Sequence, residues 1–203
     1  MAGRWGRDAF DKMLEDVWKG YDDLFTDVIQ NLDITQAEDE LERAITQVLE
    51  PRIRRCLSGD EPWDVQHGSY EYATRKPSPA QPPQYDIAFV LRRNPRIMWP
   101  LEAKVLRNGG AIGPYVRDVR QEFLTGRYAP HVNGGAMLGY LLRGCPETVF
   151  RGISDRLACR LQPLRKFDAV RHRVSVHQRE IESPDFLSGT FWCHHLVMKM
   201  YSS

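Results

Sequence analysis

Apolar side chains recur at helical spacing in two stretches near the start of the chain. In residues 7–31, charged residues separate the apolar positions, which is typical of an amphipathic helix. Residues 36–57 carry a second apolar stripe and predict a second helix, with Thr35 as its cap and Glu38 three places later as in a capping box. Proline lacks an N–H group, so Pro51 is expected to end or kink that helix.

The pattern after residue 57 favours short strands mixed with helices. Tyr70 and Tyr72 could belong to a strand, and the prolines that follow them predict an irregular loop up to residue 84. Further strands are expected over 85–92, 96–106, 136–142, 174–180 and 190–201, and further helices over 114–126 and 147–160. This order of elements predicts a mixed α/β fold with one central sheet and helices packed against it.

Charge and hydropathy limit the function classes only in part. The chain has 203 residues and a formal net charge of +1, so its total charge indicates no particular partner. Acidic residues outnumber basic ones 13 to 5 in residues 1–50, and basic residues outnumber acidic ones 9 to 3 in residues 143–179. This asymmetry indicates either a phosphate-binding face or an ordinary solvated surface. No apolar run approaches the roughly 18 residues that span a bilayer, so we expect a cytoplasmic protein without a membrane partner.

The expected hairpin around Asn94 places charged side chains where apolar ones would be usual. Alternation along the strands puts Asp86 on one face of the first strand, and Glu102 and Lys104 on one face of the second. If the turn centres on Asn94, Asp86 stands opposite Glu102 with the Cβ atoms about 5 Å apart. Two carboxylates this close repel each other unless a cation lies between them, and Mg²⁺ prefers such oxygen ligands. The pattern predicts a metal site, and an exposed sheet face with unrelated charges is the alternative.

Asp86 in one strand, followed by Glu102-Ala103-Lys104 in the next, resembles the core motif of the PD-(D/E)XK nuclease superfamily. The resemblance covers about residues 35–145. It implies an α/β restriction-endonuclease-like fold, a central mixed sheet flanked by helices, in residues 35–203, preceded by an N-terminal helical extension over residues 1–34. It also implies phosphodiester hydrolysis, in which Asp86 and Glu102 hold Mg²⁺, for which Mn²⁺ can substitute. Lys104 would position the attacking water and contact the phosphate.

The same resemblance implies further site residues on the two flanking helices. The superfamily often places a glutamate on the helix before the sheet, and Glu38 is our first choice as this third metal ligand, with Glu42 as the alternative. The helix after the Glu-x-Lys motif often carries a glutamine or a basic residue near the phosphate. We therefore expect Gln121 to be catalytic, and Arg117 and Arg120 to bind nucleic acid.

The sequence-based hypothesis is a Mg²⁺-dependent endonuclease that acts on nucleic acid, with DNA favoured as the substrate. The stretch 121–140 resembles small bacterial members linked to phage defence and restriction, so we expect an effector subunit of such a system. The small size of the chain predicts that a protein partner or a homodimer supplies target recognition. The alternative is a catalytically inactive module of the same fold, which binds nucleic acid or a partner protein as a structural subunit of a defence complex.

Overall fold

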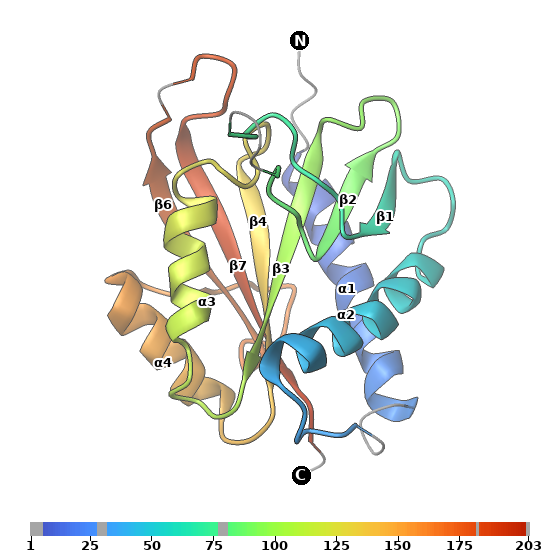
Figure 1. The fold of residues 1–203 in the computed structure, drawn as a ribbon, viewed down its shortest axis with the longest axis vertical. Helices are drawn as coiled ribbons and strands as arrows, with labels where there is room; N and C mark the ends of the chain where they lie inside the picture. The colour runs from blue at the N-terminus through green and yellow to red at the C-terminus, as the bar shows by residue number, and fades with distance from the viewer. Residues whose placement is uncertain (1–5, 28–31, 77–80, 182, 202–203) are drawn as a thin grey trace.

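The central feature of the molecule is a mixed β-sheet with helices on both faces (Figure 1). The structure is a computed structural model that describes residues 6–27, 32–76, 81–181 and 183–201. Within these residues the sheet has seven strands in the order β1-β2-β3-β4-β7-β6-β5. This arrangement confirms the predicted α/β class and the central mixed sheet flanked by helices.

The central strands of the sheet are parallel and the outer ones antiparallel. β3 pairs with β4, and β4 with β7, in parallel register, whereas β1, β2, β6 and β5 each run antiparallel to their neighbours. The strands span Trp63–His67 (β1), Ile87–Leu91 (β2), Met98–Leu106 (β3), Gly134–Leu141 (β4), Gln162–Pro163 (β5), His172–Arg179 (β6) and Gly189–Lys199 (β7). The predicted strands from residue 85 onward are thus confirmed, with ends displaced by a few residues.

Two long helices cover the face of the sheet that carries Trp99. α1 (Arg7–Asp27) stacks Phe10 on the Trp99 ring with centroids 5.6 Å apart, and its apolar stripe is buried in the same core as the sheet. α2 (Glu38–Arg55) packs closely on α1, because Gly20 has no Cβ, and a Cβ there would lie 2.8 Å from Ile53. α1 is therefore packed as part of the sheet's own core.

The opposite face of the sheet is covered by the connection from β3 to β4. This connection consists of α3 (Gly113–Asp118) and a π-helical turn, η2 (Val119–Phe123). Pro114 lies at the start of α3, as predicted, but the helical part ends at Phe123 before the predicted end at Gly126. Gly126 has a left-handed φ of 75°, which a helix cannot contain. α4 (Pro146–Leu157) follows β4 and matches the last predicted helix.

The predicted N-cap of α2 is wrong, and Pro51 does not end the helix. Its N-cap residue is Ala37, which makes no side-chain cap hydrogen bond, because the Thr35 hydroxyl donates to Asp33 instead, at 2.6 Å. The helix also continues through Pro51 to Arg55. Pro51 lies on the exposed side, and burial of Ile53 in the core holds the last turn in place.

The prediction of a strand around Tyr70 and Tyr72 is also wrong. Tyr70 makes only an isolated bridge to Gln84, and the regular strand is β1, just before it. Residues 68–75, which we call the crossing segment, follow β1 and extend to the loop after η2. There the Thr74 hydroxyl donates to the carbonyl of Arg127 at 2.7 Å. This segment lies beside Asp86, because the Gly68 N–H donates to the carbonyl of Asp86 at 3.1 Å.

Candidate acidic site on β3

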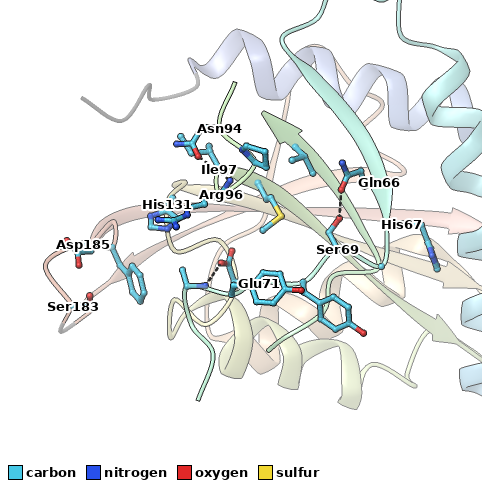
Figure 2. A pocket seen from close by; sticks show the side chains of 18 residues that line it. Gln66, His67, Ser69, Glu71, Asn94, Arg96, Ile97, His131, Ser183 and Asp185 are labelled. Atoms are coloured by element: carbon cyan, nitrogen blue, oxygen red, sulfur yellow. Dashed lines mark hydrogen bonds between the residues drawn. The ribbon is translucent and has the colours of Figure 1, made fainter. Parts of the chain in front are cut away.

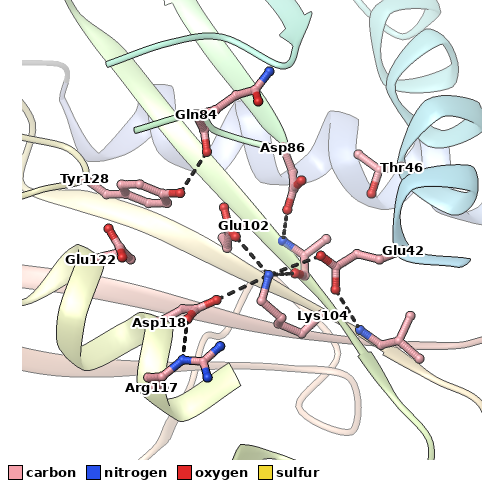
Figure 3. Close-up of polar contacts among 12 residues, drawn as sticks. Glu42, Thr46, Gln84, Asp86, Glu102, Lys104, Arg117, Asp118, Glu122 and Tyr128 are labelled. Atoms are coloured by element: carbon pink, nitrogen blue, oxygen red, sulfur yellow. Dashed lines mark hydrogen bonds and ion pairs between the residues drawn. The ribbon is translucent and has the colours of Figure 1, made fainter. Parts of the chain in front are cut away.

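The hairpin register brings Asp86 and Glu102 together as predicted. β2 and β3 pair Ile87 with Leu101 and Ala88 with Pro100, and one further step along this register sets Asp86 opposite Glu102. Both side chains lie on the α3 face of the sheet (Figure 3). The cause is local: a short turn fixes the register, and strand alternation fixes the face.

Two carboxylates replace the missing strand along the free edge of β3. β2 begins at Ile87, so the β3 amides beyond Leu101 have no strand partner on that side. The Ala103 N–H instead donates to Asp86 Oδ2 at 2.7 Å, and the Val105 N–H donates to Glu42 Oε2 at 3.3 Å (Figure 3). These backbone donors fix both acidic groups beside the strand that carries Glu102 and Lys104.

Lys104 lies at the centre of the acidic cluster. Its Nζ is 2.9 Å from Glu102 Oε1, 3.2 Å from Glu42 Oε1 and 3.3 Å from Asp118 Oδ2. It also donates to the carbonyl of Ala103 at 2.6 Å. The side chains come from α2, β3 and α3, so three elements distant in sequence converge on one ammonium group (Figure 3). With Asp86 nearby, the cluster contains four carboxyl groups and one ammonium group, so its carboxyl groups outnumber its cations.

Burial and mutual repulsion raise the pKa values of the acidic groups. Burial raises the pKa of Glu102 to about 8, with Asp86 adding to the shift and Lys104 opposing it. Burial also raises the pKa values of Asp86 and Glu42, and Lys104 again opposes both shifts. Burial alone would lower the pKa of Lys104, but Glu102, Glu42 and Asp86 outweigh it and raise that pKa, so Lys104 stays an ammonium ion.

The donors present fit a hard divalent cation that keeps part of its water shell. The buried Glu102 Oε2 has no hydrogen-bond partner among the residues that the structure describes, although Oε1 of the same carboxyl group accepts from Lys104. Among the described residues, no three Asp, Glu, His or Cys side chains form a complete metal-binding group. Mg²⁺ does not need one, because it binds through one or two carboxylates and keeps water or phosphate in its other positions. Asp86 and Glu102 would supply those carboxylates.

The third acidic residue is Glu42, and our first choice, Glu38, lies elsewhere. Glu38 is in the first turn of α2, where its side chain is 54% exposed and pairs with Arg107 at 3.4 Å. Glu42 lies one turn deeper, at the edge of the buried stripe that contains Leu41 and Ile45. One helical turn therefore decides which glutamate reaches β3.

Three residues were expected to reach the site from the helix after β3, but all three lie outside the cluster. Asp118, on the same helix, contacts Lys104 instead. Gln121 is exposed, Arg120 donates to the carbonyl of Arg156, and Arg117 contacts Asp118 at 3.4 Å from an exposed position. Asp118 itself points at Lys104. Its spacing offered a signal, because it follows the buried Tyr115 by three residues and so shares the inward side of α3.

Comparisons of this chain with protein-family models, with curated proteins and with solved structures give no match. In the described part of the chain, none of the helices has the length and apolar character needed to cross a bilayer. We therefore infer the function from the geometry of the acidic site.

Proposed function

We propose that this protein is a Mg²⁺-dependent nuclease of the restriction-endonuclease-like type, with DNA as its favoured substrate. The observation that carries the proposal is the register that sets the partly buried Asp86, just before β2, opposite the buried Glu102 of β3, with Lys104 2.9 Å from Glu102. A structural ion pair would balance its charges, whereas this cluster has more carboxyl groups than cations and, within the described part of the chain, a buried oxygen without a hydrogen-bond partner. Such an excess of carboxyl groups favours cation binding, and without a cation the raised pKa keeps a proton on Glu102 below about pH 8.

Each residue of the cluster has a role that follows from its contacts. Asp86 and Glu102 would hold the cation, which would neutralise the charge that develops on the scissile phosphate. Lys104 stays protonated because of its raised pKa, so it acts as a hydrogen-bond donor that orients the attacking water or the phosphate, and not as a base. Glu42 and Asp118 hold the ammonium group in place from α2 and α3.

The biological setting remains part of the proposal. We infer an effector of a bacterial defence or restriction system, with a partner protein or a second copy supplying target recognition. The support is the resemblance of the Asp…Glu-x-Lys motif, together with the register that sets Asp86 opposite Glu102.

Plasmid cleavage tests the proposed activity. The purified protein is expected to cleave DNA with Mg²⁺ or Mn²⁺ and to lose this activity in EDTA. Asp86→Asn keeps an acceptor for the Ala103 N–H but removes the charge, so we expect a loss of about 100-fold or more in rate. Lys104→Ala should lose activity as well. Asp64→Asn is the matched control, because Asp64 lies on the neighbouring strand β1 and pairs with Arg92 at the surface.

Cleavage that persists in EDTA or in Asp86→Asn would refute the proposed chemistry. Nucleic-acid binding without cleavage under any metal condition, with a co-purifying partner present, would favour the inactive binding module.

Glu42 and Glu38 provide a second, more selective prediction. Glu42→Gln weakens the hold on Lys104 and lowers the negative charge of the site, so about 10- to 100-fold more Mg²⁺ should be needed for half-maximal cleavage. Glu38→Gln removes the same charge from the same helix at an exposed position and should leave this concentration unchanged. The measurement is a Mg²⁺ titration of the initial cleavage rate. Equal effects of both substitutions would mean that only the general charge of α2 matters.

A further inference from the structure

A large cleft opens on the same face of the sheet as the acidic site. It has a volume of about 1190 Å³ and is bounded by the crossing segment, the β2–β3 turn and residues near His131 and Asp185 (Figure 2). This volume lies just above the roughly 300–1,000 Å³ of common small-molecule sites, so the cleft has room for a ligand of several groups.

Strand register links the cleft to the acidic site. Val90 and Met98 are paired across β2 and β3 and both line the cleft. They lie on the same face as Asp86 and Glu102, because the positions differ by an even number of residues. Four residues of strand separate Met98 from Glu102, or about 13 Å. This distance corresponds to about four stacked nucleotides.

The two sites also share a wall. The Gly68 N–H donates to the carbonyl of Asp86 at 3.1 Å, and the Tyr85 N–H donates to the carbonyl of Ser69 at 2.8 Å. Gly68 and Ser69 line the cleft, whereas Asp86 belongs to the acidic site. A nucleic-acid strand that leaves the acidic site across residues 68–69 and 85–86 therefore enters the cleft directly.

The lining of the cleft suits bases better than a duplex backbone. Tyr70 and Tyr72 line it with side chains that are 38% and 67% exposed, unusual for large aromatic groups. Amide and hydroxyl groups from Gln66, Asn94 and Ser183 add hydrogen-bonding capacity. The lining has few charged residues, with Arg96 against Glu71 and Asp185. Duplex-binding surfaces are strongly cationic, whereas sites for single strands also present aromatic rings on which successive bases stack.

We propose that this cleft binds unpaired nucleotides of a single-stranded nucleic acid, whose bases stack on Tyr70 and Tyr72 while the backbone continues into the acidic site. The inference rests on the proposed nuclease function and specifies its substrate as a single-stranded end or an unpaired region.

Binding in EDTA tests the cleft separately from cleavage. The probe is a fluorescently labelled ten-nucleotide oligothymidine, compared with a duplex of the same length by anisotropy. Single-strand binding should be tighter than duplex binding, and Tyr70→Ala with Tyr72→Ala should raise the Kd at least about five-fold. The double Tyr→Phe variant keeps both rings and should stay within about two-fold of the wild type. Phe25→Ala, an exposed aromatic residue on α1, is the matched control.

The possible outcomes separate the two proposals. Metal-free single-strand binding that depends on the rings, without cleavage in Mg²⁺, supports the cleft and refutes the nuclease. Cleavage of duplex DNA without measurable single-strand binding supports the nuclease and overturns the cleft. Single-strand binding that the double Tyr→Ala variant leaves unchanged, with an unaltered melting temperature, also overturns the cleft.

Discussion

Replacing Glu102 by glutamine is expected to abolish cleavage and, at the same time, to make the metal-free protein more stable at alkaline pH. The buried carboxyl has a pKa of about 8 in the folded protein against an ordinary value of 4.5, because burial and Asp86 disfavour its charge. The folded state therefore holds a proton that the unfolded state has lost between these two values. Stability from this group is complete below about pH 4.5 and falls as the pH rises through 8.

The glutamine variant removes this pH-dependent loss because its amide never ionises. Urea unfolding in EDTA at pH 5 and pH 9 should show that the wild type loses up to a few kcal/mol more than Glu102→Gln over this range, since each pKa unit corresponds to about 1.4 kcal/mol. Mg²⁺ should raise the unfolding midpoint of the wild type but not of the variant. A variant that is less stable than the wild type at pH 9 would show that the carboxylate is structural, with Lys104 as its required partner.

The part of the site that the sequence could predict lies within one short hairpin. Asp86, Glu102 and Lys104 are separated by a single tight turn, and strand alternation with a fixed register is enough to place all three on one face. The order of strands and helices was predictable for the same reason, because periodicity is a property of neighbouring residues. The five-residue strand β1 was not predicted, although Trp63 and Val65 alternate with polar residues there.

The rest of the site depends on contacts between elements that are distant in sequence. Glu42 and Lys104 are 62 positions apart, and the choice between Glu42 and Glu38 requires the depth at which α2 packs on the sheet. Asp118 reaches Lys104 only because α3 crosses the sheet between two parallel strands. Periodicity places a residue on a face of its own element, but not opposite a particular residue of another element. The cleft could not be predicted from the sequence either, because the crossing segment that bounds it has no periodic pattern of apolar residues.

Replacing Arg179 by methionine is expected to destabilise the whole domain strongly. This side chain is 1% exposed, and its guanidinium group lies 4.5 Å from the centroid of the Phe191 ring. It donates to the backbone carbonyls of Phe123, Tyr128, Ala129, Val132 and Leu187. Methionine fills a similar volume but leaves these buried acceptors without donors, at a cost of about 3–5 kcal/mol. Thermal unfolding should show a fall in Tm of about 10 °C or more.

Arg173→Met provides the control for this prediction, because Arg173 lies on the same strand β6 but pairs with Glu147 at the surface, where the loss should stay below about 1 kcal/mol. Arg179→Lys should fall between the two, since one ammonium group cannot reach all five carbonyls. The effect should extend to the acidic site. Arg179 holds the segment that carries Tyr128, and the Tyr128 hydroxyl donates to the carbonyl of Gln84 at 2.8 Å, two residues before Asp86. A normal Tm for Arg179→Met would mean that other contacts already hold this segment in place.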